Sequence, residues 1–136
     1  MNSPAGALAL LERPLVAVVS TAGRTPHAVP VWFRYASAGD YGTFWIWSDR
    51  SRAWVRRLER DPNVQLVVAE SEPPFAAILA RGRATLEHRN VLDEAHRICE
   101  RYLAPADTPA YLEAWRHLDT IVTIEVESLR GWDRGY

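Results

Sequence analysis

The sequence contains no lysine. Apart from its histidines, its basic residues are 16 arginines. An enzyme that forms a Schiff base through a lysine amine is therefore excluded. Any charged side chain that holds a phosphate must be an arginine, whose flat guanidinium can contact two oxygens at once. The single cysteine, Cys99, excludes an intrachain disulfide, which fits a reducing compartment.

Motifs that mark several enzyme classes are also missing. No G-x-S-x-G turn is present, which argues against a hydrolase with a serine nucleophile at such a turn. No glycine-rich phosphate motif is present, which argues against a Walker or Rossmann nucleotide site. The four histidines show no ligand spacing with one another or with Cys99, so we expect no metal site. A net charge of −1 argues against a nucleic-acid-binding surface.

No apolar run is long enough to cross a membrane. The N-terminal run ends at Glu12 and Arg13 and follows no basic segment, so we do not expect a signal peptide either. We therefore expect a cytoplasmic protein with no membrane partner. The chain of 136 residues, 48% of them hydrophobic, suits one domain that spans residues 1–136.

The pattern of apolar residues predicts about six strands and three or four short helices. The expected strands are residues 15–20, 27–35, 43–47, 63–70, 75–87 and 121–126, with a bulge at Gly82. The expected helices are residues 3–11, 50–60 and 90–103, and a further helix that starts at Thr108. Because the strands do not alternate regularly with helices, we expect an α+β fold whose mostly antiparallel sheet forms a small barrel.

The segment from Trp47 to Asp61, WSDRSRAWVRRLERD, concentrates the chemistry of the sequence. It predicts a strand end, a cap at Ser48 or Asp49, and an arginine-rich helix. A helix start beside arginines is a natural site for a phosphate. An arginine-rich solvated helix face is the simpler alternative.

Four motifs in order give the chain a resemblance to a known family. They are TAGRTP at residues 21–26, PHAVPVWF at 26–33, RRLERDPNV at 56–64 and RGRA at 81–84. With a strand and a helix between the second and third motifs, this order resembles the flavin-binding split barrels related to pyridoxamine 5′-phosphate oxidase. The resemblance covers residues 13–87 well and the C-terminal part more loosely. It implies a six-stranded split β-barrel with peripheral short helices.

The resemblance also implies a homodimer with FMN, or the deazaflavin coenzyme F-420, in clefts at the dimer interface. By the same resemblance, the flavin ring lies against Val29, Pro30 and Val31, and Trp47 and Ser48 flank the ribityl chain and phosphate. The implied phosphate-binding cations are Arg52 and Arg56, with Arg50 and Arg57 as neighbours. A C-terminal tail containing Trp132 and Arg134 is expected to reach the partner's site.

The sequence departs from the family pattern early in the helix, where Ala53 and Trp54 replace basic residues that are common in the family. The leading hypothesis is an FMN- or F-420-dependent oxidoreductase that transfers hydride or electrons to or from a small organic substrate. FMN is slightly favoured, because one short phosphate site is visible. A non-catalytic flavin or haem sensor and a cofactor-free dimer are the alternatives. No residue is assigned as a catalytic acid or base, and the vitamin B6 reaction is not transferred.

Overall fold

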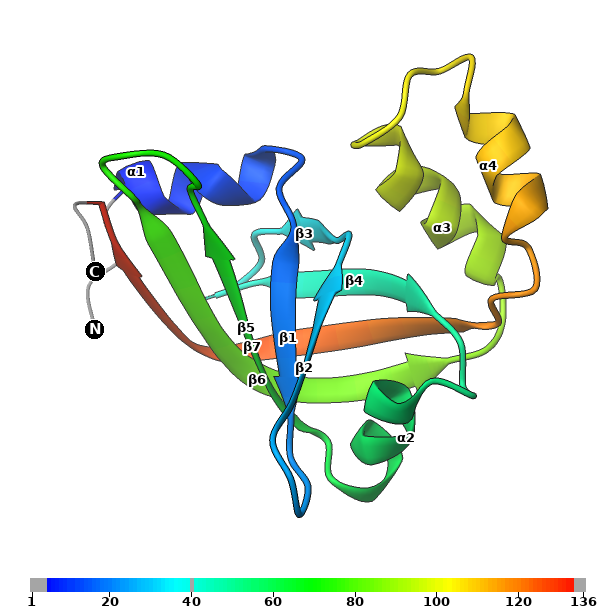
Figure 1. Ribbon diagram of the computed structural model, residues 1–136, viewed down its shortest axis with the longest axis horizontal. Coiled ribbons are helices and arrows are strands. Elements are labelled where there is room, and N and C mark those ends of the chain that lie inside the picture. The colour runs from blue at the N-terminus through cyan, green and yellow to red at the C-terminus, as the bar shows by residue number, and fades with distance from the viewer. Residues whose placement is uncertain (1–4, 40, 134–136) are drawn as a thin grey trace.

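The computed structural model describes residues 5–39 and 41–133. Within these residues, seven antiparallel strands form one sheet, in the order β2-β1-β5-β6-β7-β4-β3 (Figure 1). The strands are β1 (Ala17–Thr21), β2 (His27–Val31), β3 (Arg34–Ala36), β4 (Thr43–Ser48), β5 (Asn63–Ala69), β6 (Ala77–Glu87) and β7 (Thr120–Trp132). The helices are α1 (Ala5–Leu8), the 3-10 helix η1 (Ala9–Glu12), α2 (Ala53–Arg60), α3 (Val91–Glu100) and α4 (Thr108–Ala114).

The sheet curls until its two edges approach each other. Strands β2 and β3 are the edge strands, yet only Trp32 and Phe33 separate them in sequence. Three peptide units span at most about 10–11 Å, so the two edges must lie that close where the chain crosses. The expected α+β fold with a mostly antiparallel split barrel is therefore confirmed: a short covalent crossover, in place of a ladder of hydrogen bonds, joins the edges.

The strand expected over residues 27–35 is two strands, which makes seven strands where the sequence predicts six. The strand is interrupted because side chains, in place of a neighbouring strand, form the hydrogen bonds to the backbone of Phe33. Its N–H donates to the Tyr102 hydroxyl at 3.0 Å, and its carbonyl accepts a hydrogen bond from the Arg101 guanidinium. The Phe33 ring is fully buried. Residue pattern alone did not reveal this break, because its partners lie about 70 residues along the chain.

Alternation along the strands fills the inside of the curled sheet. Inward residues such as Val19, Ile46 and Leu66 are almost completely buried, and their neighbours are more exposed. Helix α2 adds the apolar stripe Trp54, Val55 and Leu58 to the same core. These contacts hold α2 against the sheet, so its first turn has a fixed position near the end of β4.

Several element boundaries differ from the expectation. Helix α2 begins at Ala53 and not at residue 50, with Arg52 as its N-cap and no side-chain cap. Asp49 instead accepts a hydrogen bond from the backbone N–H of Ser51 at 2.8 Å, which forms a separate turn. Strand β7 continues to Trp132, well beyond the expected end at residue 126.

The expected bulge at Gly82 is confirmed by a register shift between Arg81 and Gly82. A Cβ atom at this position would lie 2.1 Å from the carbonyl oxygen of Glu125, so the close approach requires glycine. The helix expected over residues 90–103 ends at Glu100. None of the helices within the described residues is long and apolar enough to span a membrane.

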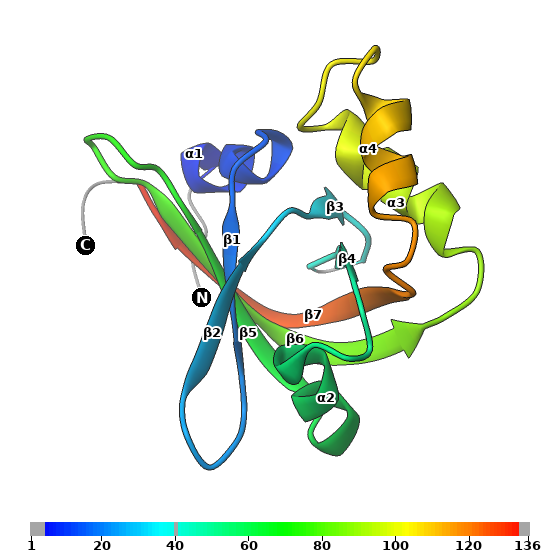
Figure 2. The same cartoon turned by 45° about the vertical axis from the view of Figure 1, so that its right-hand side comes forward.

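Helices α3 and α4 lie side by side at one end of the sheet, away from α1 (Figures 1 and 2). Two anchors hold α3 there. Glu94 forms a bidentate ion pair with Arg34 of β3, at 2.6 and 2.7 Å, and Arg34 lies over the ring of Trp45. Arg101 donates to the carbonyl oxygens of Leu11 and Phe33. The helix pair is therefore fixed beside the barrel as a wall.

Candidate functional site

A cleft of about 590 Å³ opens where β2, the end of β4 and the start of α2 face the α3–α4 pair. This volume is typical of small-molecule sites. The lining side chains are mostly aliphatic and aromatic, and their only positively ionisable groups are His27 and Arg52. They contain no aspartate or glutamate. The lining residues are Val16, His27, Val29, Pro30, Val31, Trp32, Trp47, Ser48, Arg52, Ala53, Trp54, Ile98, Cys99, Tyr111, Trp115 and Leu118.

One end of the cleft is polar and suited to an anion. Ser48 there is 7% exposed as a whole residue, and its hydroxyl has no hydrogen-bond partner among the described residues. Arg52 is exposed and makes no ion pair within the described part of the chain. The first N–H groups of α2 lack partners inside the helix, and Ala53 and Trp54 of that turn also line the cleft. We call Ser48, Arg52 and this first turn the anion seat.

Six of the nine residues expected to bind a cofactor come together in this cleft. Strand β2 supplies Val29, Pro30 and Val31, the end of β4 supplies Trp47 and Ser48, and the start of α2 supplies Arg52. Arg50, Arg56 and Arg57 do not line it. Whether the six residues bind a cofactor stays a prediction.

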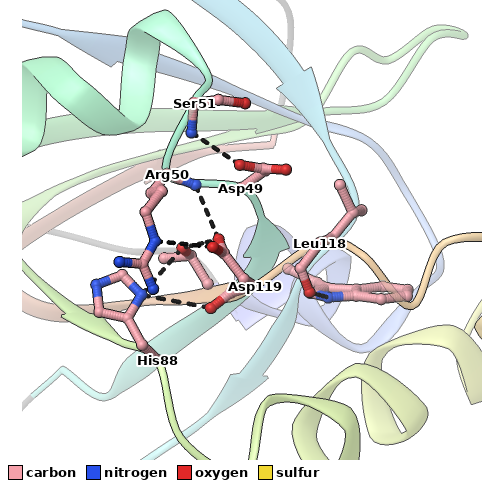
Figure 3. A network of polar contacts seen from close by, with 8 residues as sticks. Asp49, Arg50, Ser51, His88, Leu118 and Asp119 are labelled. Carbon is pink, nitrogen blue, oxygen red and sulfur yellow. Dashed lines mark hydrogen bonds and ion pairs between the residues drawn. The ribbon is translucent and has the colours of Figure 1, made fainter.

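Arg50 instead joins the end of β4 to the loop before β7 (Figure 3). Its guanidinium Nε lies 2.7 Å from Asp119 Oδ2, and its backbone N–H donates to Asp119 Oδ1 at 3.0 Å. The neighbouring Leu118 carbonyl accepts from the indole N–H of Trp47 at 3.0 Å. Leu118 and Asp119 lie in the short segment that joins α4, which ends at Ala114, to β7, so these contacts fix the end of α4 opposite the anion seat.

Arg57 holds the turn between β1 and β2. Its two terminal nitrogens donate to the Thr25 carbonyl at 2.6 Å and to the Thr25 hydroxyl at 3.1 Å. The turn packs so closely that a Cβ on Gly23 would lie 2.5 Å from Arg57 Nη1. Arg57 therefore positions β2 relative to α2, while Arg56 is exposed on the helix surface.

Several residues of the cleft were not expected from the sequence. His27 could have been found, because it lies two residues before Val29 and so points to the same face of β2 as Val29 and Val31. No local signal could have placed Cys99 or Tyr111 here, because they lie far along the chain on α3 and α4. Burial raises the pKa of the Cys99 thiol to about 11, so it is protonated and is not a thiolate nucleophile at neutral pH.

The C-terminal tail is only partly described. Trp132 ends β7, where it pairs with Ala77 of β6, and it does not line the cleft of its own chain. Arg134 lies outside the described residues. A role of this tail in a partner's site therefore stays a prediction. In the part of the chain that the structure describes, no three histidine, cysteine, aspartate or glutamate side chains gather in a way that could hold a metal ion.

Known proteins share this architecture. The chain resembles the solved F420 Reductase with 21% identity, covering 93% of this chain and 97% of that one, with a TM-score of 0.73. It resembles the conserved hypothetical protein Rv2991 from Mycobacterium tuberculosis with 19% identity, covering 98% and 86%, with a TM-score of 0.73. A FAD-binding protein from Mesorhizobium loti is 16% identical over 96% and 94%, with a TM-score of 0.67. At these identities the likeness shows the fold alone.

The family assignment comes from the sequence itself. No curated protein matches the chain. The family model described as Pyridoxamine 5′-phosphate oxidase, however, matches residues 4–133, which is almost the whole chain. This match agrees with the curled antiparallel sheet and confirms the resemblance seen in the four motifs: the chain belongs to the pyridoxamine 5′-phosphate oxidase-like family of split barrels.

Proposed function

We propose that the chain is an FMN-dependent oxidoreductase whose cleft holds the cofactor. The observation that carries the proposal is the anion seat. The Ser48 hydroxyl makes no hydrogen bond to a described residue, and its oxygen is not among the buried unpaired polar atoms, so it is open to a ligand in the cleft. A phosphate bound at this end of the cleft would accept hydrogen bonds from the Ser48 hydroxyl, from Arg52 and from the first turn of α2.

The rest of the cleft suits the flavin ring. Val29, Pro30 and Val31 give an apolar surface on an edge strand, and Pro30 donates no hydrogen bond to a ladder. When bound, FMN supplies the hydride chemistry, and the protein supplies binding, orientation and electrostatics. The residues present therefore fit FMN at both its phosphate and its ring, even though Ala53 and Trp54 replace basic residues common in the family.

The arginines favour FMN over coenzyme F-420. The longer acidic tail of F-420 would require a longer basic track, which Arg50 and Arg57 could have formed together with Arg60. Arg50 is instead paired with Asp119, and Arg57 with Thr25. A single compact phosphate contact at Arg52 is thus the best-supported arrangement.

We infer in addition that the chain acts as a homodimer. An apolar row crosses the outer face of the sheet, in which Pro30 lies opposite Val18, Val18 opposite Val67, and Val67 opposite Leu79. Val18 is 38% exposed in the single chain. A contiguous apolar patch of this kind is typical of an interaction surface, and Pro30 connects it to the cleft.

An FMN titration tests the proposal. FMN added to the purified protein should lose fluorescence with a stoichiometry of one per chain, and Ser48→Ala should weaken binding about threefold to tenfold. Ser51→Ala, an exposed serine outside the cleft, is the control and should bind FMN as the wild type does. No binding by the wild type, or equal affinities for all three proteins, would refute the anion seat.

A second measurement separates an enzyme from a sensor. The FMN-loaded protein should be reduced by NADH or NADPH and then reoxidised by an organic acceptor. Tight FMN binding without turnover by either donor would favour the non-catalytic module. A visible Soret band in the purified protein would favour haem over FMN.

A further inference from the structure

The cleft has a second compartment that the proposed flavin site does not use. Helices α3 and α4 supply Ile98, Cys99 and Tyr111 to its wall, and Trp115 and Leu118 follow α4. None of these side chains is charged at neutral pH, and burial raises the pKa of both the Cys99 thiol and the Tyr111 hydroxyl. We call this wall the α3–α4 compartment.

Its aromatic rings form a row of contacts that includes an accessible tryptophan, Trp115, whose ring also lies 5.7 Å from the ring of His117. Trp32 stacks on Tyr111 with ring centres 5.3 Å apart, and Tyr111 contacts Trp115 at 6.2 Å. The other side of Trp32 is covered by Tyr102, at 4.6 Å with nearly parallel rings. Trp115, in contrast, is 39% exposed at the cleft. It is therefore the ring of this row that a ligand can contact.

The charges around the compartment select against a cation. Aromatic faces can attract cations, but no carboxylate among the described residues lines this cleft, and Arg52 and His27 are the positively ionisable groups of its described lining. An ammonium group would lose its hydration without gaining a counter-ion, which is costly. An uncharged ring system gains from burial against Trp115, Ile98 and Leu118 without that cost.

We propose that the α3–α4 compartment binds an uncharged, planar aromatic molecule, which is the second reactant of the cleft. The assignment of that molecule as a reactant rests on the proposed flavin function. The binding itself does not, because it depends only on side chains of α3, α4 and the segment after α4.

The test measures ligand binding by isothermal titration calorimetry, in protein with and without FMN. The probes are 2-naphthol, its saturated analogue decahydro-2-naphthol, and the cation 2-naphthylmethylammonium. The proteins are the wild type, Trp115→Ala, Trp115→Phe and Leu92→Ala. Leu92 is a matched control, because it is an exposed apolar residue on α3 that does not line the cleft.

We expect 2-naphthol to bind the wild type about threefold to tenfold more tightly than either other probe. Trp115→Ala should remove that preference, Trp115→Phe should keep most of it, and Leu92→Ala should not change it. Equal affinities for 2-naphthol in Trp115→Ala and wild type would overturn the proposal, as would preferred binding of the ammonium probe. If FMN does not bind but 2-naphthol still binds in a Trp115-dependent way, the flavin function is refuted. The proposal that the α3–α4 compartment binds an uncharged planar aromatic molecule is then still supported.

Discussion

At the scale of single residues, the candidate site depends on which arginines remain free. Arg50 and Arg57 are each held by two hydrogen bonds, to Asp119 and Thr25. Arg52 makes no such contact within the described residues and lies on the cleft wall. An arginine and a hydroxyl that both line the cleft and both lack hydrogen-bond partners among the described residues form the arrangement that an anionic ligand completes.

Arg52→Ala should therefore weaken FMN binding by about 1.5–3 kcal/mol, the usual contribution of a hydrogen bond to a charged group. Arg60→Ala is the matched control, because Arg60 is an exposed arginine at the other end of α2. Arg56→Ala should have a smaller effect than Arg52→Ala, because Arg56 shares the helix face but lies outside the cleft. Equilibrium fluorescence titration distinguishes the three variants, and an equal loss in Arg52→Ala and Arg60→Ala would indicate only a general charge effect.

A second residue-scale prediction concerns Tyr102, whose hydroxyl accepts from the Phe33 N–H at 3.0 Å and donates to the Leu15 carbonyl at 2.8 Å. Tyr102→Phe removes the partner of both partly buried backbone groups, so we expect a loss of about 1–3 kcal/mol in the free energy of unfolding. Tyr111→Phe is the control, because the Tyr111 hydroxyl has no hydrogen bond to a described residue. Urea unfolding curves should separate the two variants, and equal stabilities would contradict this role of Tyr102.

At the scale of elements, the loop before β7 fixes α4 across the cleft. The Asp119 carboxylate accepts hydrogen bonds from the Arg50 backbone N–H and from the Thr120 hydroxyl, and pairs with the Arg50 guanidinium (Figure 3). These contacts, the backbone N–H first among them, hold the pKa of Asp119 below its ordinary value of 3.8. The contribution of Asp119 to the free energy of unfolding is therefore complete at pH values above its ordinary pKa. It is lost as the pH falls through the lower pKa of the folded state.

Asp119→Asn should lower the free energy of unfolding by about 0.5–1.5 kcal/mol at neutral pH, since the pair is partly exposed and screened. The difference from wild type should shrink as the pH falls below 3.8 and through the lowered folded-state pKa of Asp119. Urea unfolding across this range measures the change. Glu127→Gln, at an exposed carboxylate of β7 outside any ion pair of the described residues, should show no such trend. A constant difference at all pH values would contradict the account of Asp119.

Elements with strong local patterns could be predicted from the sequence, and elements set by distant contacts could not. The alternation in β5 and the apolar stripe of α2 located these elements within a few residues. The break after Val31 depends on Tyr102, which no local pattern connects to it. The same distinction applies to the site: β2, Trp47, Ser48 and Arg52 could be anticipated, but the α3–α4 wall could not.

At the scale of the whole molecule, the apolar outer face of the sheet supports the proposed dimer. Val18→Asp places a charge in the middle of the row formed by Pro30, Val18, Val67 and Leu79. Sedimentation velocity should show a dimer for the wild type and a shift toward monomer for Val18→Asp, because an unpaired charge is costly to bury. Leu92→Asp, on the exposed surface of α3, should remain dimeric. A wild type that sediments as a monomer would refute the dimer. A Val18→Asp variant that stays dimeric would refute the proposed interface on the outer face of the sheet.

The central claim for the molecule is that FMN binds with its phosphate at the anion seat and its ring along β2. A crystal structure of the protein grown with FMN tests this most directly. The account predicts phosphate oxygens within hydrogen-bonding distance of the Ser48 hydroxyl and the Arg52 guanidinium, with the ring against Val29, Pro30 and Val31. Ring or phosphate density at another surface, with the cleft beside Ser48 holding only water, would contradict it.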